Sequence, residues 1–155
     1  KKLKGKCSNC DNAISTKYPL TEFATGMLFL FSFNAIPKDI YFENFALNLF
    51  FSWALILILL SISIIDFEFL WIPNSIIMIG FLFGLASSIF SAIVNYQNIL
   101  IQLFVNLISG ILGFLIIILI IKSGELVFKK PSMGLGDAKL AAMIGFWIGL
   151  PGVII

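Results

Sequence analysis

The chain has 155 residues, of which 60% are hydrophobic, and its formal net charge is only +2. A soluble domain is usually about 45–50% apolar, so this excess of apolar residues indicates a polytopic membrane protein rather than one globular core. The chain contains no histidine, which excludes Ser-His-Asp triads, Cys-His pairs and HExxH zinc sites. The small net charge gives no indication of a nucleic-acid partner.

Residues 1–19 form a polar, basic segment that contains the sequence CSNC. Its two cysteines, Cys7 and Cys10, have the spacing of half a zinc site. A structural zinc ion needs four ligands, and two cysteines in a chain without histidine cannot supply them. The simpler alternative is a pair of free thiols, because disulfides are rare in the cytosol. We therefore expect this segment to be metal-free, unless another CxxC motif precedes it in a longer chain.

Residues 20–155 are expected to form one membrane-embedded unit. About 20 apolar residues span a bilayer as an α-helix, and the apolar runs here are continuous rather than alternating, which favours helices. The predicted fold class is therefore all-α, with about five transmembrane helices. The first run is the weakest, because Glu22 and Thr25 interrupt it. The predicted helices cover residues 20–36, 45–65, 75–94, 99–121 and 138–155.

The third predicted helix contains Gly80 and Gly84 at GxxxG spacing. Small residues at this spacing allow two helices to approach closely in lipid. The sequence therefore predicts a close helix contact on this face.

The lysines predict the orientation of the helices in the membrane. They concentrate before the first span and around the loop at 122–137, whereas the loop at 95–98 carries no charge. Because cytoplasmic loops are enriched in Lys and Arg, we expect the lysine-rich ends to face the cytoplasm. With alternating spans, Asp66 and Asp137 then lie at the same cytoplasmic face.

Asp66 ends the second apolar run. An ionised carboxylate deep in a bilayer costs several kcal/mol, so one interpretation is a boundary residue that marks where the helix leaves the membrane. The following residues, FEFLWIP, are still mostly apolar, which favours a half-buried pocket instead. Pro73 disfavours helical geometry at Ile72, so we expect a turn between Asp66 and the next helix.

Asp137 lies in the sequence GLGD, directly after Gly134, Leu135 and Gly136. Glycine permits unusual dihedral angles and close approach of another chain, which a protease needs beside an extended substrate. The simpler interpretation is a loop in which Asp137 caps the helix beginning at residue 138, and both can hold. Lys139 can snorkel to the interface or tune Asp137.

Two carboxylates within a few ångströms cannot both ionise easily and tend to share one proton. The ionised carboxylate can take a proton from water, while the protonated one can donate a hydrogen bond to a peptide carbonyl. Asp66 and Asp137 are therefore predicted to hydrolyse a peptide bond without a metal or a histidine.

The sequences GKCSNCDNAISTKYPLTEFATG, IIDFEFLWIPN and MGLGDAKLAAMIG together resemble the bacterial type IV prepilin peptidases, which are membrane aspartyl proteases of the GxGD kind. The resemblance runs from Gly5 to about Pro151. It implies cleavage of the basic leader from prepilins and pseudopilins at the cytoplasmic face of the bacterial inner membrane. For many members it also implies N-methylation of the product with S-adenosylmethionine.

By motif, the resemblance implies a catalytic pair at Asp66 and Asp137. The resemblance also implies that the other matching residues of the second motif form a substrate-binding loop; these are Gly134, Gly136 and Lys139. The family's zinc-binding segment has its second CxxC at Cys7 and Cys10. Helices and a first CxxC that flank these motifs in the family are absent here, so we expect a chain truncated at both ends. Zinc binding and methylation are accordingly expected of the complete protein.

Two alternatives from other classes stay open. One is a non-catalytic membrane protein, such as a scaffold or a small transporter, whose polar groups should lie near the membrane midplane. Gln102, Asn106 and Ser109 support it, although interhelical hydrogen bonding explains them more simply. The other is a GxGD protease with another substrate, such as an archaeal preflagellin peptidase, but the CSNC segment favours the bacterial group. The expected partners are a prepilin or pseudopilin and membrane lipid.

Overall fold

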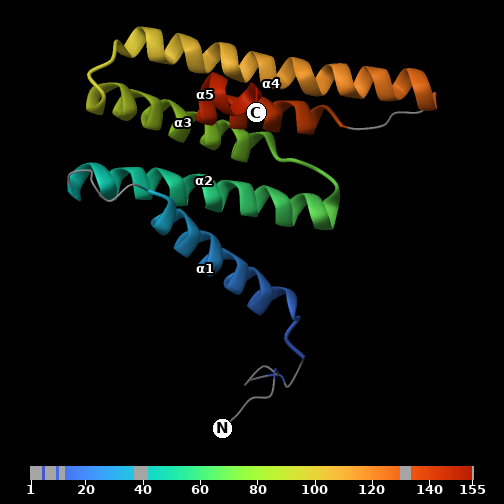
Figure 1. Ribbon diagram of the computed structural model, residues 1–155. Coiled ribbons are helices and arrows are strands. Elements are labelled where there is room, and N and C mark those ends of the chain that lie inside the picture. Colours follow the sequence, from blue (N-terminus) through green and yellow to red (C-terminus); the bar gives the residue numbers. More distant parts are fainter. Residues whose placement is uncertain (1–4, 6–9, 11–12, 37–41, 130–133, 155) are drawn as a thin grey trace.

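The computed structural model describes residues 5, 10, 13–36, 42–129 and 134–154 (Figure 1). Over this part of the chain it contains five α-helices, and the all-α prediction is confirmed. The helices are α1 (Lys17–Ala35), α2 (Phe42–Phe69), α3 (Asn74–Val94), α4 (Ile99–Phe128) and α5 (Leu135–Ile154).

Within the described residues, three segments are long and apolar enough to cross a membrane. They are Asn44–Phe69, Asn74–Val94 and Ile99–Val127, with mean hydropathy of 2.3, 2.3 and 2.9. The chain is therefore a polytopic membrane protein. The helices α1 and α5 occupy the places of the first and fifth predicted spans, and their passage through the membrane stays a prediction.

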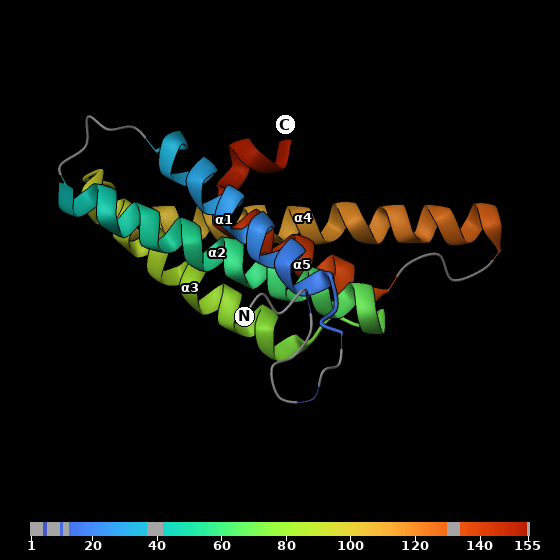
Figure 2. The ribbon, with the colours of Figure 1, turned by 90° about the horizontal axis from the view of Figure 1, so that it is seen from below.

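Two helices continue beyond the apolar runs that predicted them. The helix α2 ends at Phe69 rather than at residue 65, and α4 ends at Phe128 rather than at residue 121. The 30 residues of α4 correspond to about 45 Å at 1.5 Å per residue, which exceeds the roughly 30 Å of a bilayer's hydrocarbon layer. In both ribbon views α4 extends past the other helices at the end that precedes α5 (Figures 1 and 2).

The helices α2, α3 and α4 lie side by side, and α5 packs against α3 and α4 (Figure 1). Among the described residues, α1 contacts only α2. The two helices are close where Phe29 stacks on Trp53, with ring centroids 4.7 Å apart. They diverge toward the N-terminal end of α1 (Figure 1).

The apolar core lies among α2, α3 and α5. Its buried members are Ile58, Ile62, Ile72, Ile77 and Met143. The predicted close contact at the GxxxG face is confirmed, and the partner helix is α5. A Cβ added at Gly84 would lie 2.8 Å from Trp147 Nε1, and a Cβ added at Gly80 would overlap the Met143 sulfur. Trp147 Nε1 also donates a hydrogen bond to the Gly80 carbonyl at 2.9 Å.

One of the three polar side chains in α4 that were predicted to form interhelical hydrogen bonds does so. Asn106 Nδ2 donates to Ser88 Oγ at 2.9 Å and joins α4 to α3, as predicted. The prediction is wrong for Gln102 and Ser109, which bond within α4. Gln102 donates to Asn106 at 3.2 Å, and the Ser109 hydroxyl donates to the Val105 carbonyl one turn earlier, a partner that serine reaches easily within a helix.

Candidate active site

A cavity of about 300 Å³ lies where α2 ends and α5 begins, and both predicted aspartates line it. Asp66 and Asp137 are each half-buried. The fold thus brings together two carboxylates from distant parts of the sequence, at one end of the helix bundle. The complete lining is Asp66, Leu70, Trp71, Ile72, Asn74, Gly134, Leu135, Gly136, Asp137 and Lys139.

The end of α2 sets the position of Asp66. This residue lies in the last turn of the helix rather than after it, and its carbonyl accepts a hydrogen bond from the Leu70 N–H at 2.8 Å. Leu70 has a left-handed backbone with φ of 50°, which stops the helix. Pro73 is extended and immediately precedes α3. The predicted turn between Asp66 and the next helix is therefore confirmed.

The GLGD sequence forms the start of α5. Because α5 begins at Leu135, Asp137 lies in its first turn and not at the cap position expected as one interpretation. A carboxylate in the first turn interacts favourably with the positive end of the helix dipole. A Cβ added at Gly136 would lie 3.2 Å from Ile72 Cβ. A Cβ added at Gly134 would lie 3.8 Å from Asp137 Oδ2, with no described atom outside the adjacent residues closer than that. Gly136 therefore allows α5 to rest against the link between α2 and α3.

Lys139 connects α5 to α3. Its Nζ donates a hydrogen bond to Asn74 Oδ1 at 2.9 Å, and both residues are exposed. Among the described residues, Lys139 takes part in no ion pair. The cavity therefore contains one ammonium group, held by a neutral amide, beside two carboxylates.

Asn74 and Leu70 were not predicted as site residues, although the sequence holds a signal for both. Asn74 directly follows Pro73 in the first motif, and Leu70 is four residues after Asp66, the spacing of neighbours on one helix face. The helix α2 itself ends one residue before Leu70. Leu70 and Trp71 are 88% and 62% exposed. Exposed apolar and aromatic side chains suit the boundary between membrane and water.

The other predicted candidates lie elsewhere. Cys10 is an exposed free thiol, and Cys7 lies outside the described residues. Within the described part of the chain, no group of three or more His, Cys, Asp or Glu side chains is placed to hold a metal ion; zinc binding by Cys7 and Cys10 stays a prediction. Glu22 is exposed on α1 and does not line the cavity.

Two half-buried carboxylates that line one cavity can act as acid and base toward a molecule bound there.

Comparisons with known proteins indicate a family of peptidases. Residues 53–155 match the type IV leader peptidase family, and residues 2–36 match the bacterial peptidase A24 N-terminal domain. The chain is 32% identical to a prepilin leader peptidase/N-methyltransferase of Legionella pneumophila, over 95% of this chain and 46% of the relative. Proteins of the same name from Stutzerimonas stutzeri and Bacillus subtilis are 33% and 30% identical, over 95% of this chain and 46% and 52% of theirs.

The chain spans about half the length of the curated relatives it matches. It has no significant match among solved structures.

Proposed function

This chain belongs to the type IV leader peptidase family, and from that membership we propose that it is an aspartic endopeptidase that removes the leader peptide from type IV prepilins or pseudopilins. The observation that carries the proposal is the cavity shared by Asp66 and Asp137. Relatives that match 95% of the chain are named for action on prepilins.

In the proposed mechanism, one carboxylate of the pair takes a proton from a bound water molecule. The other, as the protonated carboxylic acid, donates a hydrogen bond to the scissile carbonyl, so the developing negative charge on its oxygen is stabilised. The hydroxide adds to the carbonyl carbon, and the C–N bond of the tetrahedral intermediate breaks as the first aspartate returns the water's proton to the amide nitrogen. Both carboxylates then return to their starting state.

Lys139 and Gly136 complete the proposed site. The Lys139 ammonium, fixed by Asn74 at 2.9 Å, reduces repulsion between the carboxylates and orders the rim of the cavity. Gly136 keeps the backbone close to the link after α2, which leaves room above Gly134 for an extended peptide.

We place the cavity at the cytoplasmic face of the bacterial inner membrane. The lysines of the helix ends support this placement, because cytoplasmic ends are enriched in lysine. The end of the bundle that holds the cavity carries four of them, Lys17, Lys122, Lys129 and Lys139. N-methylation with S-adenosylmethionine, and zinc binding by Cys7 and Cys10, stay predictions from the family resemblance, and no described residue is assigned to either.

The test is cleavage of a type IV prepilin in membranes that contain the protein in its full natural length. Asp66→Asn and Asp137→Asn preserve the shape of each side chain and should each lower the cleavage rate at least about 10²-fold. Glu125→Gln is the matched control, because Glu125 is exposed on α4 outside the cavity, and it should cleave at the parent rate.

If either aspartate variant inserts normally and still cleaves at near the parent rate, that aspartate is a boundary residue and the proposed mechanism is wrong. A parent protein that inserts but cleaves no prepilin would favour the alternative of a non-catalytic membrane protein.

A further inference from the structure

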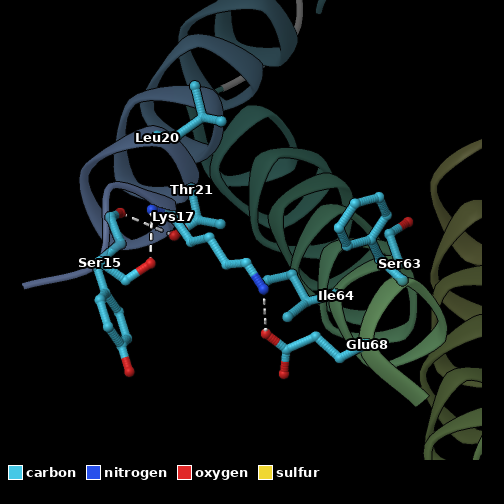
Figure 3. Close-up of a pocket in the computed structure, with 9 residues that line it drawn as sticks. Ser15, Lys17, Leu20, Thr21, Ser63, Ile64 and Glu68 are labelled. Atoms are coloured by element: carbon cyan, nitrogen blue, oxygen red, sulfur yellow. Dashed lines mark hydrogen bonds and ion pairs between the residues drawn. The ribbon is translucent and has the colours of Figure 1, made fainter.

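A second and larger hollow, of about 700 Å³, lies between α1 and α2 (Figure 3). We call it the α1–α2 groove. Leu20 on α1 and Ile64 and Phe67 on α2 line it with apolar surface, and these side chains are 67%, 41% and 79% exposed. In a membrane protein, apolar surface exposed to this degree is covered by lipid or by another protein segment.

An ion pair crosses the polar end of the groove. Lys17 Nζ lies 3.0 Å from Glu68 Oε1, and the two side chains are 60% and 40% exposed (Figure 3). The Lys17 ammonium also lies 5.9 Å from the centre of the Phe67 ring. The polar end of the groove therefore presents one positive and one negative group side by side, with no net charge.

Each member of the ion pair has unused hydrogen-bonding capacity. An ammonium group has three donor hydrogens and a carboxylate has about four acceptor positions, and Lys17 and Glu68 share one contact. A ligand can therefore bind both groups without separating them. Its own charges must be opposite and must lie close together, because a purely anionic ligand would be repelled by Glu68 and a purely cationic one by Lys17.

We propose that the α1–α2 groove binds a phospholipid with a zwitterionic headgroup and a primary ammonium, of the phosphatidylethanolamine type. The lipid phosphate accepts hydrogen bonds from Lys17, and the lipid ammonium donates to Glu68. An acyl chain lies along Leu20, Ile64 and Phe67. A quaternary ammonium has no N–H to donate, so a choline headgroup makes the weaker contact with Glu68.

The position of the groove links this lipid to the candidate active site. At 100° per residue, Ser63 and Phe67 lie next to Asp66 around the axis of α2, so the groove and the cavity occupy neighbouring faces of the same two turns. Since α1 and α2 diverge here, a bound lipid fills the space between them beside the turn that carries Asp66.

The test is lipid retention by the purified full chain in native mass spectrometry, after addition of phosphatidylethanolamine, phosphatidylcholine and phosphatidylglycerol in equal amounts. The parent protein should retain phosphatidylethanolamine at least about fivefold over either of the others, because only this lipid makes two charge-assisted hydrogen-bonded contacts. Glu68→Gln should bring phosphatidylethanolamine and phosphatidylcholine to within about twofold of one another.

Two further variants and one control complete the design. Lys17→Gln should lower retention of all three lipids, because each has a phosphate. Ser63→Leu should fill part of the groove and lower retention while leaving the ion pair in place, which keeps the test valid if a charge variant disturbs α1. Glu125→Gln, on exposed α4 surface, should keep the parent preference.

Equal retention of the three lipids by the parent, or a preference for phosphatidylglycerol, would overturn the proposal. A phosphatidylethanolamine preference that survives in Glu68→Gln would place the lipid elsewhere and overturn it as well. If the parent protein retains none of the three lipids, the proposal is wrong, and an apolar segment of a protein partner becomes the candidate occupant of the groove. Because lipid retention does not depend on proteolysis, none of these results confirms or contradicts the proposed function, which the cleavage assay tests separately.

Discussion

At the residue scale, the two glycines of GLGD have different surroundings and should respond differently to substitution. A Cβ at Gly136 would press on buried Ile72 at 3.2 Å, whereas the nearest described atom to a Cβ at Gly134 is 3.8 Å away. Gly136→Ala should therefore shift the start of α5 and Asp137 with it. A misplacement of catalytic groups by about 1 Å can lower a rate by about 10²-fold, so Gly136→Ala should slow cleavage at least about tenfold.

The measurement is prepilin cleavage per amount of inserted protein, with Gly134→Ala as the matched variant. Gly134→Ala should lose less activity than Gly136→Ala. Equal losses would show that the contact with Ile72 does not distinguish the two glycines.

The hydrogen bond between Lys139 and Asn74 gives a second prediction at this scale. Asn74→Asp replaces an amide acceptor by a carboxylate of the same shape, so the 2.9 Å contact becomes an exposed ion pair that adds at most about 1 kcal/mol. Cleavage by Asn74→Asp should stay within about fivefold of the parent rate. Asn74→Leu removes the acceptor and should slow cleavage more. An Asn74→Leu variant with parent activity would exclude a positioning role for this hydrogen bond.

The two aspartates, Gly136 and Lys139 were predicted from the sequence, but their contacts were not. Counting spans and lysines predicts that Asp66 and Asp137 lie at one face, which needs no knowledge of contacts. The contact of Gly136 with Ile72 joins α5 to the link between α2 and α3, and that of Lys139 with Asn74 joins α5 to α3. Local patterns do not encode such pairs, because they depend on how α5 lies against α3.

At the element scale, the packing of α4 on α5 is the closest approach of one helix backbone to another that the described glycines report. A Cβ at Gly113 would lie 2.7 Å from the Ala141 carbonyl oxygen, and one at Gly145 would lie 2.7 Å from the Ser109 carbonyl oxygen. Carbonyl oxygens in helices cannot move aside as a flexible side chain can. Gly113→Ala should therefore push the helices apart and lower the free energy of unfolding by about 1–3 kcal/mol.

The control for this prediction is Gly26→Ala on α1, where a Cβ would meet nothing within 4 Å. That substitution should leave the stability unchanged or raise it by about 0.5–1 kcal/mol, because alanine favours helices over glycine. Thermal unfolding of both variants in the same detergent separates the two cases. If Gly113→Ala is as stable as the parent, close packing of α4 on α5 does not stabilise the fold.

The helices themselves were predicted well from apolar runs, but their ends were not. The apolar run of α4 stops at residue 121, whereas the helix continues to Phe128 through Lys122 and Glu125. Apolar content marks the layer in contact with lipid, while backbone hydrogen bonding continues where lysine and glutamate, both good helix formers, reach water. The same reasoning explains why α2 includes Asp66.

At the scale of the whole molecule, the groups assigned to chemistry lie at one end of the bundle, and the sequence of the α3–α4 turn carries no charge. The α3–α4 turn, at the opposite end, contains Tyr96, which is 98% exposed. The cavity lies at the other end, together with Asp137 in the first turn of α5. This separation was predictable from the lysines. The divergence of α1 from α2 was not, because it depends on aromatic contacts at one end of the two helices, whereas an ion pair of long side chains, Lys17 with Glu68, spans the other end.

The orientation of the molecule in the membrane can be measured by cysteine labelling in intact cells. In a Cys7→Ser, Cys10→Ser background, Tyr96→Cys should react with a membrane-impermeant maleimide, because the uncharged turn is expected outside the cytoplasm. Glu125→Cys, exposed at the cavity end of α4, should react only after the membrane is permeabilised. The reverse pattern would place Asp66 and Asp137 outside the cytoplasm, where a leader that is still attached to a cytoplasmic precursor cannot reach them, and cytoplasmic leader cleavage by this pair would then be wrong.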